Sequence, residues 1–183
     1  MAYLATVKMS HHLNLPNWGY AGTSDAQIPD GQATFEAGLM SYMSLVAGSN
    51  LNHDVGYLDF GLTGSLEMVV IMNEVIDEIR RMQQGIPVNQ ETLAIEVIEE
   101  GARQGEFLSH PHTLTHLRNT QWRPQLMNRM GHDQWDIDGR KDLLSKAREA
   151  LKNILDGHQA RQVPGDKTVQ IQACMERFRK EIL

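Results

Sequence analysis

The chain has 183 residues, of which 41% are hydrophobic and 22% are charged, a composition typical of one folded domain. The formal net charge of -6 argues against nucleic acid as the main partner, and no apolar run is long enough to span a bilayer. A single cysteine, Cys174, excludes an internal disulfide framework and suits a reducing compartment, so we expect a cytoplasmic protein.

The charges are unevenly distributed along the chain. Residues 1–139 contain 7 Lys and Arg against 17 Asp and Glu, whereas residues 140–183 contain 10 against 6. The acidic portion also contains every candidate functional residue. Long-range attraction of a cationic substrate is damped within about 8 Å at physiological salt, so the asymmetry only suggests a cationic ligand.

The first third of the chain is predicted to alternate short strands with long helices. A helix over residues 3–14 precedes an aromatic strand at 17–22, and a second strand is predicted at 51–55. Asp30 is placed to cap a helix over residues 31–47. Because helices follow the strands, we expect the strands to be parallel, with open edges that need covering.

The helix over residues 31–47 carries two kinds of side chain at helical spacing. Its large apolar residues are Phe35, Leu39, Tyr42, Met43 and Val46. Its small residues, which would let a neighbour pack closely, are Ala33, Ala37, Gly38 and Ser41. The next helix, capped by Thr63 or Ser65, has an apolar stripe of Met68, Met72, Val75, Ile79 and Met82, which we interpret as core filler.

The rest of the chain is predicted to be helical with irregular connections. Asn89 caps a helix over residues 90–100, and a helical turn passes through His116. Further helices are expected at 140–156 and, capped by Asp166, at the C-terminus. The segments predicted to be irregular are 121–124, 131–139 and the linker 162–165.

The stretch from Asn50 to Glu67 is the richest in chemistry, because it places Asn52, His53, Asp54, Tyr57 and Asp59 within eight residues. Ionisable groups between a strand and a helix N-terminus are typical of an active site in an α/β protein. The alternative is a polar loop whose Asn and Asp side chains only stabilise turns.

Several motifs resemble the trimethylamine methyltransferase family of corrinoid-dependent enzymes. They are Gly22-Thr-Ser-Asp25, His53-Asp-Val-Gly-Tyr57, Gly85-Ile-Pro-Val, Phe107-Leu-x-His110 and Trp122-Arg-Pro. The resemblance covers about residues 1–158 and implies the C-terminal part of a TIM (β/α)8 barrel. We therefore expect an α/β, helix-rich fold, with residues 159–183 forming a linker and an amphipathic tail helix.

The resemblance also implies an activity. Family members move a methyl group from a methylated amine to the cobalt of a corrinoid carried by a partner protein, so no tightly bound cofactor is expected here. Trimethylamine-specific members carry pyrrolysine just before the Ser-Asp of the first motif, where this chain has Thr23. The chain therefore looks like the branch that includes glycine betaine methyltransferases.

A quaternary ammonium donor agrees with this reading, because it departs as a neutral amine and needs no special electrophile. It needs aromatic faces for the cation and alignment of one methyl group. The candidate catalytic residues are His53, Asp54 and Thr23, and we expect Thr23 and His53 at the same end of adjacent strands. The candidate substrate-binding residues are Trp18, Tyr20, Tyr57, Asp25 and Gln32.

Two alternatives remain open at this point. His110, His112 and His116 form an H-x-H-x3-H pattern that would suit a zinc hydrolase, although Pro111 also fits a helix start after His110. The chain could instead be a non-catalytic scaffold that self-associates. We expect a homo-oligomer that is inactive in isolation, with no nucleic-acid or membrane partner.

Overall fold

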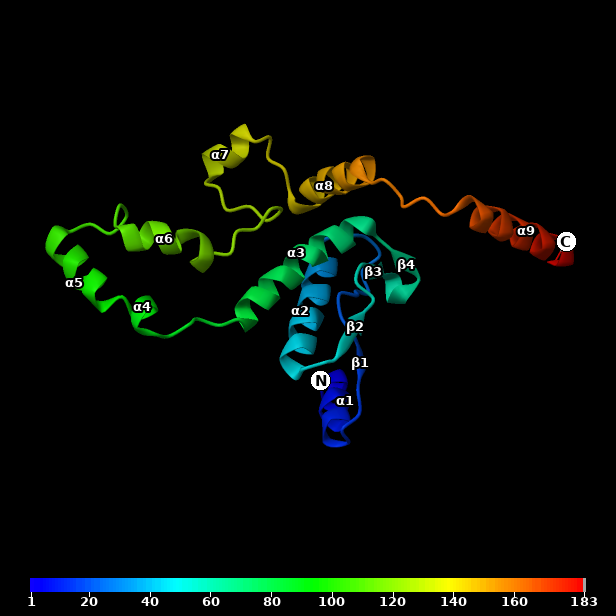
Figure 1. Cartoon of the computed structure of the whole chain (residues 1–183), viewed down its shortest axis with the longest axis horizontal. Coiled ribbons are helices and arrows are strands. Elements are labelled where there is room, and N and C mark those ends of the chain that lie inside the picture. The colour runs from blue at the N-terminus through cyan, green and yellow to red at the C-terminus, as the bar shows by residue number, and fades with distance from the viewer. Residues whose placement is uncertain (183) are drawn as a thin grey trace. The chain divides into compact units, whose positions relative to one another are not determined.

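The computed structural model describes residues 1–182 and contains short strands among longer helices (Figure 1). The N-terminal elements are α1 (Ala2–His12), β1 (Trp18–Tyr20), α2 (Gly31–Ala47), β2 (Leu51–His53), β3 (Tyr57–Leu58), the 3-10 turn η1 (Asp59–Gly61), β4 (Thr63–Gly64) and α3 (Leu66–Gln83). The remaining helices are α4 (Gln90–Leu93), α5 (Ile95–Gln104), α6 (Pro111–Thr120), α7 (His132–Ile137), α8 (Leu143–Gly157) and α9 (Gly165–Ile182). The fold is therefore helix-rich.

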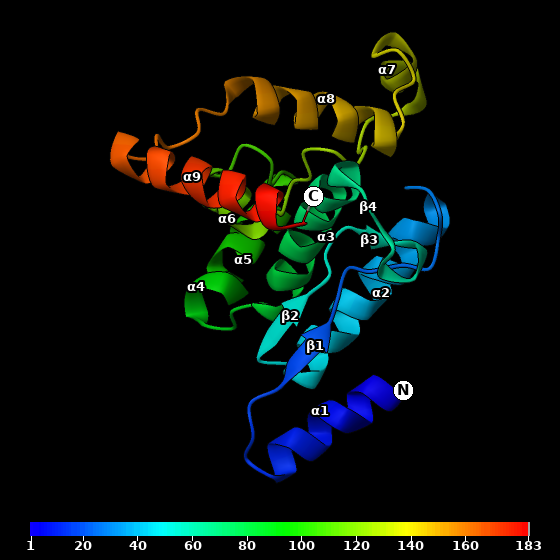
Figure 2. The same ribbon diagram turned by 90° about the vertical axis from the view of Figure 1, so that its right-hand side faces the viewer.

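β1 and β2 form a parallel pair, which confirms the predicted strand direction. Trp18 pairs with Leu51, and Tyr20 pairs with His53. Figure 2 shows the two strands side by side, with α2 running behind them. This pair, with α2 and α3 each following a strand, agrees with an α/β class, while closure into a barrel stays a prediction.

The helices α1 and α2 cover one face of the β1–β2 pair. The hydroxyl of Tyr3 lies 2.7 Å from the hydroxyl of Ser44 and donates to Oδ1 of Asn52 at 3.3 Å. Gly19 is required beneath this ring, because a Cβ there would lie 1.7 Å from the Tyr3 hydroxyl. The polar contacts therefore fix α1, α2 and β2 to one another.

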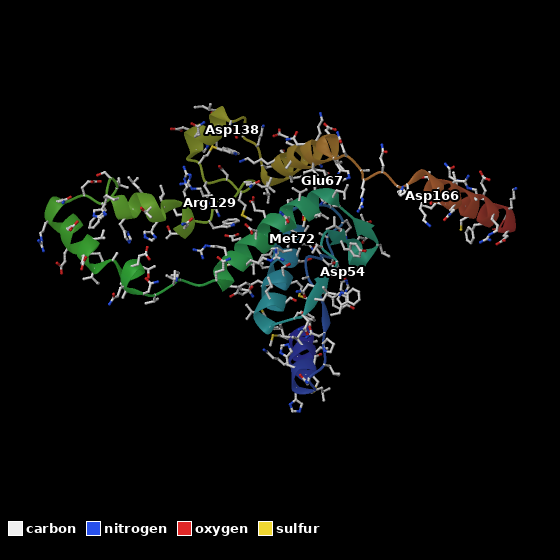
Figure 3. All side chains as sticks on the ribbon, in the orientation of Figure 1. Asp54, Glu67, Met72, Arg129, Asp138 and Asp166 are labelled. Atoms are coloured by element: carbon white, nitrogen blue, oxygen red, sulfur yellow. The ribbon has the colours of Figure 1, made fainter. Side chains whose placement is uncertain are left out.

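The main core lies where α2 packs on α3. Small side chains of α2, such as Ala33 and Ala37, meet the buried Met68 and Met72 of α3. Figure 3 shows Met72 at this interface. The prediction that the α3 methionines fill the core is confirmed for these two residues, whereas Met82 is exposed. Other members of the core cluster are Ala26, Leu58, Ile71, Leu126 and Ala147.

The caps of the two long helices follow the sequence prediction. The carboxylate of Asp30 accepts from the amide of Ala33 at 3.0 Å, and the hydroxyl of Ser65 accepts from the amide of Met68 at 3.1 Å. Each cap satisfies an amide that the first turn of its helix leaves unpaired. These contacts set where the loops after β1 and β2 end.

A short antiparallel hairpin, β3–β4, follows β2 and was not predicted. Tyr57 pairs with Gly64 and Leu58 with Thr63. Its turn has left-handed backbone at Asp59, Phe60 and Gly61, with φ values of 50°, 56° and 82°. Left-handed backbone is unfavourable for a bulky residue such as Phe, so strain is concentrated at this turn.

Two acidic side chains of α3 form hydrogen bonds with the irregular segment 122–127, which follows α6. Oε2 of Glu74 accepts from the amides of Gln125 and Leu126 at 2.6 and 2.7 Å, and Oε1 accepts from that of Met127 at 2.8 Å. The indole of Trp122 donates to Asp77 at 2.7 Å. The burial of Glu74 is explained by these three donors.

Three details of the later chain correct the sequence prediction. The helix expected over 90–100 is broken at Ala94, whose φ of 50° separates α4 from α5. The segment 131–139, predicted to be irregular, contains α7. The last helix begins at Gly165, so Asp166 lies in its first turn and not at its cap. A negative charge in that turn still stabilises the helix N-terminus.

The chain divides into two compact units, residues 1–151 and a second unit that begins at Lys152 and contains α9. In the second unit, the apolar side chains of Ile171, Met175 and Phe178 are exposed on α9. Among residues 1–182, no helix combines the length and the apolar character that a membrane crossing requires.

Candidate functional site

The loops that follow β1 and β2 run side by side, because backbone pairing continues beyond the strands. The amide of Ala21 donates to the carbonyl of His53 at 3.1 Å, and the amide of Gly56 donates to that of Gly22 at 3.0 Å. The amide of Ser24 then donates to the carbonyl of Tyr57 at 3.0 Å. The structure thus confirms that Thr23, flanked by two of these contacts, follows its strand at the same end as His53.

Gly22 makes this close pairing possible. Its φ of 77° is in the left-handed region, and an added Cβ would lie 3.0 Å from the backbone of Val55. A side chain at this position would push the two loops apart. The first residue of the Gly22-Thr-Ser-Asp25 motif is therefore glycine because the close approach of the two loops requires it.

Three aromatic rings gather on the face of β1–β2 that the helices leave open. The ring centroid of His53 lies 5.1 Å from that of Trp18 and 5.1 Å from that of Tyr20. Trp18 and Tyr20 are both more than half exposed, and His53 is half-buried. Side chains on alternate strand positions share a face, which is why these three meet. We call Trp18, Tyr20 and His53 the aromatic cluster.

Asp54, labelled in Figure 3, directly follows His53 and adds a negative charge beside the aromatic cluster. Its Oδ1 lies 2.5 Å from Nδ1 of His53, and its backbone is left-handed with φ of 70°. This backbone turns the carboxylate back toward the imidazole of the preceding residue. Left-handed non-glycine backbone is frequent at functional sites.

The other predicted site residues lie around the same loops. Tyr57 is in the β3–β4 hairpin, where it pairs with Gly64, and is not one of the clustered rings. Asp25 is exposed, and Gln32 is exposed at the start of α2. Thr23 is half-buried between the paired backbones.

Glu36 is a site-loop residue that the sequence interpretation missed. Its Oε2 accepts from the hydroxyl of Ser24 at 2.6 Å and from the amide of Asp25 at 3.1 Å, while Oε1 accepts from the Gln32 amide at 3.0 Å. These donors, with Ser24 contributing most, lower the pKa of the Glu36 carboxyl. The position of Glu36 one helical turn after Gln32 could have suggested their contact, but no local pattern indicated that Glu36 also contacts Ser24.

The three histidines of the H-x-H-x3-H pattern make hydrogen bonds and ion pairs within the protein. Nδ1 of His110 accepts from the amide of His112 at 3.1 Å and so caps α6, with Pro111 at its first position. Nε2 of His112 lies 3.0 Å from the backbone carbonyl of Glu91, and Nε2 of His116 lies 3.3 Å from the side-chain carboxylate of Glu91. Within residues 1–182, no group of three or more metal-ligating side chains is arranged to hold an ion. The zinc hydrolase alternative therefore gains no support.

A cleft lies elsewhere in the first unit. It has a volume of about 780 Å³ and is lined by the start of α2 and the start of α8, including Ile28, Phe35, Leu143 and Arg148. No predicted site residue lines it. Arg148 lies 3.5 Å from the carboxylate of Glu67 on α3, so its charge is partly paired.

The aromatic cluster and Asp54 suit a soft organic cation better than an anion. Indole and phenol faces attract cations within about 6 Å of the ring centre. The Asp54 carboxylate next to these rings adds a further attraction for a cation. A cationic ligand also agrees with the excess of acidic residues in positions 1–139.

Comparison with known proteins finds a matching family model and relatives that carry the same name. The family model described as "Trimethylamine methyltransferase (MTTB)" matches residues 1–182. The chain is 32% identical over 181 residues to trimethylamine methyltransferase MttB of Desulfitobacterium hafniense, covering 99% of this chain. It is 32% identical over 176 residues, 96% of this chain, to the protein of the same name from Methanosarcina barkeri.

A second kind of relative is more distant. Glycine betaine methyltransferase of Desulfitobacterium hafniense is 21% identical over 179 residues, 97% of this chain. The match covers 37% of that relative, and 36% and 35% of the two trimethylamine methyltransferases. The chain therefore spans little more than a third of the length of the relatives it matches.

Proposed function

Because the chain belongs to the trimethylamine methyltransferase family, we propose that it forms the C-terminal portion of a corrinoid-dependent methyltransferase. The methyl donor in this proposal is a quaternary ammonium compound similar to glycine betaine, or another methylated amine. Residues 1–158 would be part of a (β/α)8 barrel, and residues 159–183 a linker and tail helix. A cytoplasmic location and self-association are part of the same proposal.

The observation that carries the proposal is the aromatic cluster on the open face of a parallel strand pair. Parallel strands are normally covered on both faces, and the open face of β1–β2 presents Trp18 and Tyr20. If further strands extended the sheet into a barrel, this face would line its interior. The cluster would then lie near the C-terminal ends of the strands, where barrel enzymes bind their substrates.

The residues of this chain would act by holding and orienting the donor. Trp18 and Tyr20 would contact the positive trimethylammonium group, and the Asp54 carboxylate would add attraction for it. His53, held by Asp54, would orient a carboxylate or a water near the donor. Thr23 lies on the neighbouring loop and would limit the pose of the group being attacked.

The acceptor in this proposal is a corrinoid carried by a partner protein, which supplies a Co(I) nucleophile. When a methyl carbon of a quaternary ammonium is attacked, the electron pair of the C–N bond stays on nitrogen, and a neutral tertiary amine leaves. No proton has to be delivered. The chain therefore needs alignment and exclusion of water rather than an acid catalyst.

Two kinds of evidence support different donors. The trimethylamine methyltransferase of Desulfitobacterium hafniense is 32% identical, against 21% for the glycine betaine enzyme. By the resemblance of the Gly22-Thr-Ser-Asp25 motif, however, Thr23 stands where trimethylamine-specific members carry pyrrolysine, and its hydroxyl offers no comparable electrophile. We favour the quaternary donor because the reaction chemistry depends on this position more than on overall identity.

Binding of small methylated cations tests the proposal. In nuclear magnetic resonance titrations of the 183-residue chain, glycine betaine and tetramethylammonium are expected to shift the backbone amide signals of β1 and β2, and glycine is not. Trp18→Ala and Tyr20→Ala should each weaken binding about 2- to 30-fold, the range of one cation–π contact. Phe178→Ala, an exposed aromatic residue in the second unit, is the matched control.

The panel also separates the donors. A larger response to trimethylamine hydrochloride than to glycine betaine would contradict the quaternary reading. A chain that responds to none of these cations, or that responds equally after Trp18→Ala, would remove the aromatic cluster as the binding site.

A further inference from the structure

Of the three residues in the aromatic cluster, His53 is the one whose charge can change near neutral pH. An imidazole takes up or releases a proton between about pH 5 and 8, whereas an indole carries no charge and a phenol stays neutral in this range. The ring centroids of Trp18 and Tyr20 each lie 5.1 Å from that of His53. A ligand on either ring is therefore next to a group with two charge states.

The contact with Asp54 determines which nitrogen of His53 carries a permanent hydrogen. Nδ1 of His53 lies 2.5 Å from Oδ1 of Asp54, and an ionised carboxylate only accepts hydrogen bonds, so Nδ1 is the donor. Nε2 is then the atom that differs between the charge states. It is an acceptor in the neutral ring and a donor in the imidazolium. The His53 side chain is 35% exposed, so a ligand can reach this ring.

The groups around His53 come from three segments. The strand β1 contributes Trp18 and Tyr20, and the loop after β2 contributes the Asp54 carboxylate. From α1, the ring centroid of Tyr3 lies 6.4 Å from that of Tyr20. The helix α2 packs on the other face of the strand pair. Within this set a single carboxylate faces His53, so protonation of the imidazole changes the local charge from negative to neutral.

Protonated His53 competes with a simple cation. An imidazolium here is itself a cation beside two aromatic rings and a carboxylate, which are the partners that would otherwise attract a trimethylammonium group. The two positive charges would also repel each other. A ligand that carries only a positive charge therefore binds best to neutral His53, and its affinity falls as the pH falls.

A ligand that also carries a carboxylate reverses this preference. Its positive end can lie on Trp18 and Tyr20 while its carboxylate accepts a charge-assisted hydrogen bond from Nε2 of the imidazolium. Neutral His53 would instead direct a lone pair of Nε2 at that carboxylate, because Asp54 holds the ring hydrogen on Nδ1. A zwitterionic ligand therefore binds best to protonated His53, and its affinity rises as the pH falls.

We propose that His53 selects the charge type of the methyl donor. Its protonated form favours zwitterionic quaternary ammonium compounds, and its neutral form favours simple quaternary cations. This inference rests on the proposed function, because it assigns the donor to the aromatic cluster. It adds a choice that Trp18 and Tyr20 cannot make, since aromatic faces attract the positive group of both donor types.

Affinity as a function of pH tests the selection in the 183-residue chain. Dissociation constants of glycine betaine and tetramethylammonium are measured from the backbone amide shifts of β1 and β2 between about pH 5.5 and 8, where an imidazole titrates and both ligands keep their charges. The preference for glycine betaine over tetramethylammonium should increase at least about fivefold from the upper to the lower pH. In His53→Gln this preference should not depend on pH.

His132→Gln is the matched control, because this imidazole also lies beside a tryptophan. The ring centroids of His132 and Trp135 are 5.7 Å apart, in a T-shaped arrangement like that of His53 and Trp18. Removal of this histidine should leave the pH dependence of both affinities as in the wild type. An equal loss of pH dependence in His132→Gln would overturn the assignment to His53.

The imidazole signals of His53 give a reciprocal test that needs only the unmodified chain. Because proton and ligand binding are linked, saturating tetramethylammonium should lower the pH at which His53 is half-protonated, and saturating glycine betaine should raise it. A midpoint that is the same with either ligand as without would overturn the proposal, even if the His53→Gln chain did not fold.

The outcomes separate this inference from the function on which it rests. If both ligands bind to the aromatic cluster but their relative affinity does not change with pH, selection by His53 is wrong and the proposed function stands. The same conclusion follows if the relative affinity changes equally in His53→Gln. If neither ligand binds at any pH, both the selection and the proposed function are wrong.

Discussion

The hydroxyl of Ser24 donates a 2.6 Å hydrogen bond to the carboxylate of Glu36, which joins the loop after β1 to the second turn of α2. Ser24 is buried, and its hydroxyl also accepts from the amide of Ala26 at 3.0 Å. The pair fixes the loop that contains Thr23. A carboxylate from the following helix thus positions the loop of Thr23 through its neighbour Ser24.

Glu36→Gln is expected to loosen this loop in a pH-dependent way. Hydrogen bonds from Ser24, Gln32 and Asp25 lower the pKa of the Glu36 carboxyl, so its stabilising effect is full above its ordinary value of 4.5 and is lost as the pH falls through the lower folded-state value. The stability difference between wild type and variant, measured by urea unfolding, should be constant from pH 6 to 8 and shrink below pH 4.5. The exposed Glu96→Gln is the control, and an equal pH dependence there would refute the assignment.

Glu74→Ala should destabilise the first unit by roughly 2–4 kcal/mol, because three backbone amides lose a charged acceptor. Amide hydrogen exchange at residues 125–127 should accelerate before the rest of the chain is affected. Asp77→Asn keeps an acceptor for the Trp122 indole and is expected to cost less than about 1 kcal/mol. Equal losses for the two variants would mean that Glu74 does not act through this segment.

Gly19→Ala should cost roughly 1–3 kcal/mol, because its Cβ would displace the Tyr3 ring from Ser44 and Asn52. In a Tyr3→Ala background, the same change should cost much less. Chemical unfolding of the two single variants and the double variant gives the interaction energy directly. Simple additivity would show that the ring and the glycine are not in contact.

Phe60→Asn is expected to stabilise the chain by up to about 1 kcal/mol, since Asn tolerates the left-handed backbone that Phe60 adopts at φ of 56°. The Phe60 side chain is exposed, so little packing is lost. Thermal unfolding measures the gain. A loss of stability would show instead that Phe60 makes a contact that favours its strained backbone.

The sequence predicted the elements that depend on local chemistry. Asp30 and Ser65 mark their helix starts because capping needs only the residues of the first turn. The parallel strand pair, and the shared end of Thr23 and His53, followed from the order of strands and helices. The β3–β4 hairpin was missed because each strand has two residues, too few to show a periodic pattern.

Other features depend on partners that are distant in the sequence. The roles of Glu36 and Glu74 follow from contacts with Ser24 and with residues 125–127, and a helical carboxylate gives no local sign of such a contact. The prediction that the small residues of α2 let a neighbour pack closely is confirmed, since Ala33, Ala37 and Ser41 are buried. Periodicity alone did not show that the large apolar residues of α2 lie on the exposed side. Which side of a helix is buried depends on how closely its neighbour approaches.

The small-residue face of α2 limits how this helix can diverge over evolutionary time. Ala33 and Ala37 leave no volume for a larger side chain against Met68 and Met72, so growth at these sites would require α3 to retreat. The outer positions have no such restriction from the protein's own core. Homologous chains should therefore tolerate few replacements on the inner side, while the outer side is free to change and, with it, the choice of molecular neighbour.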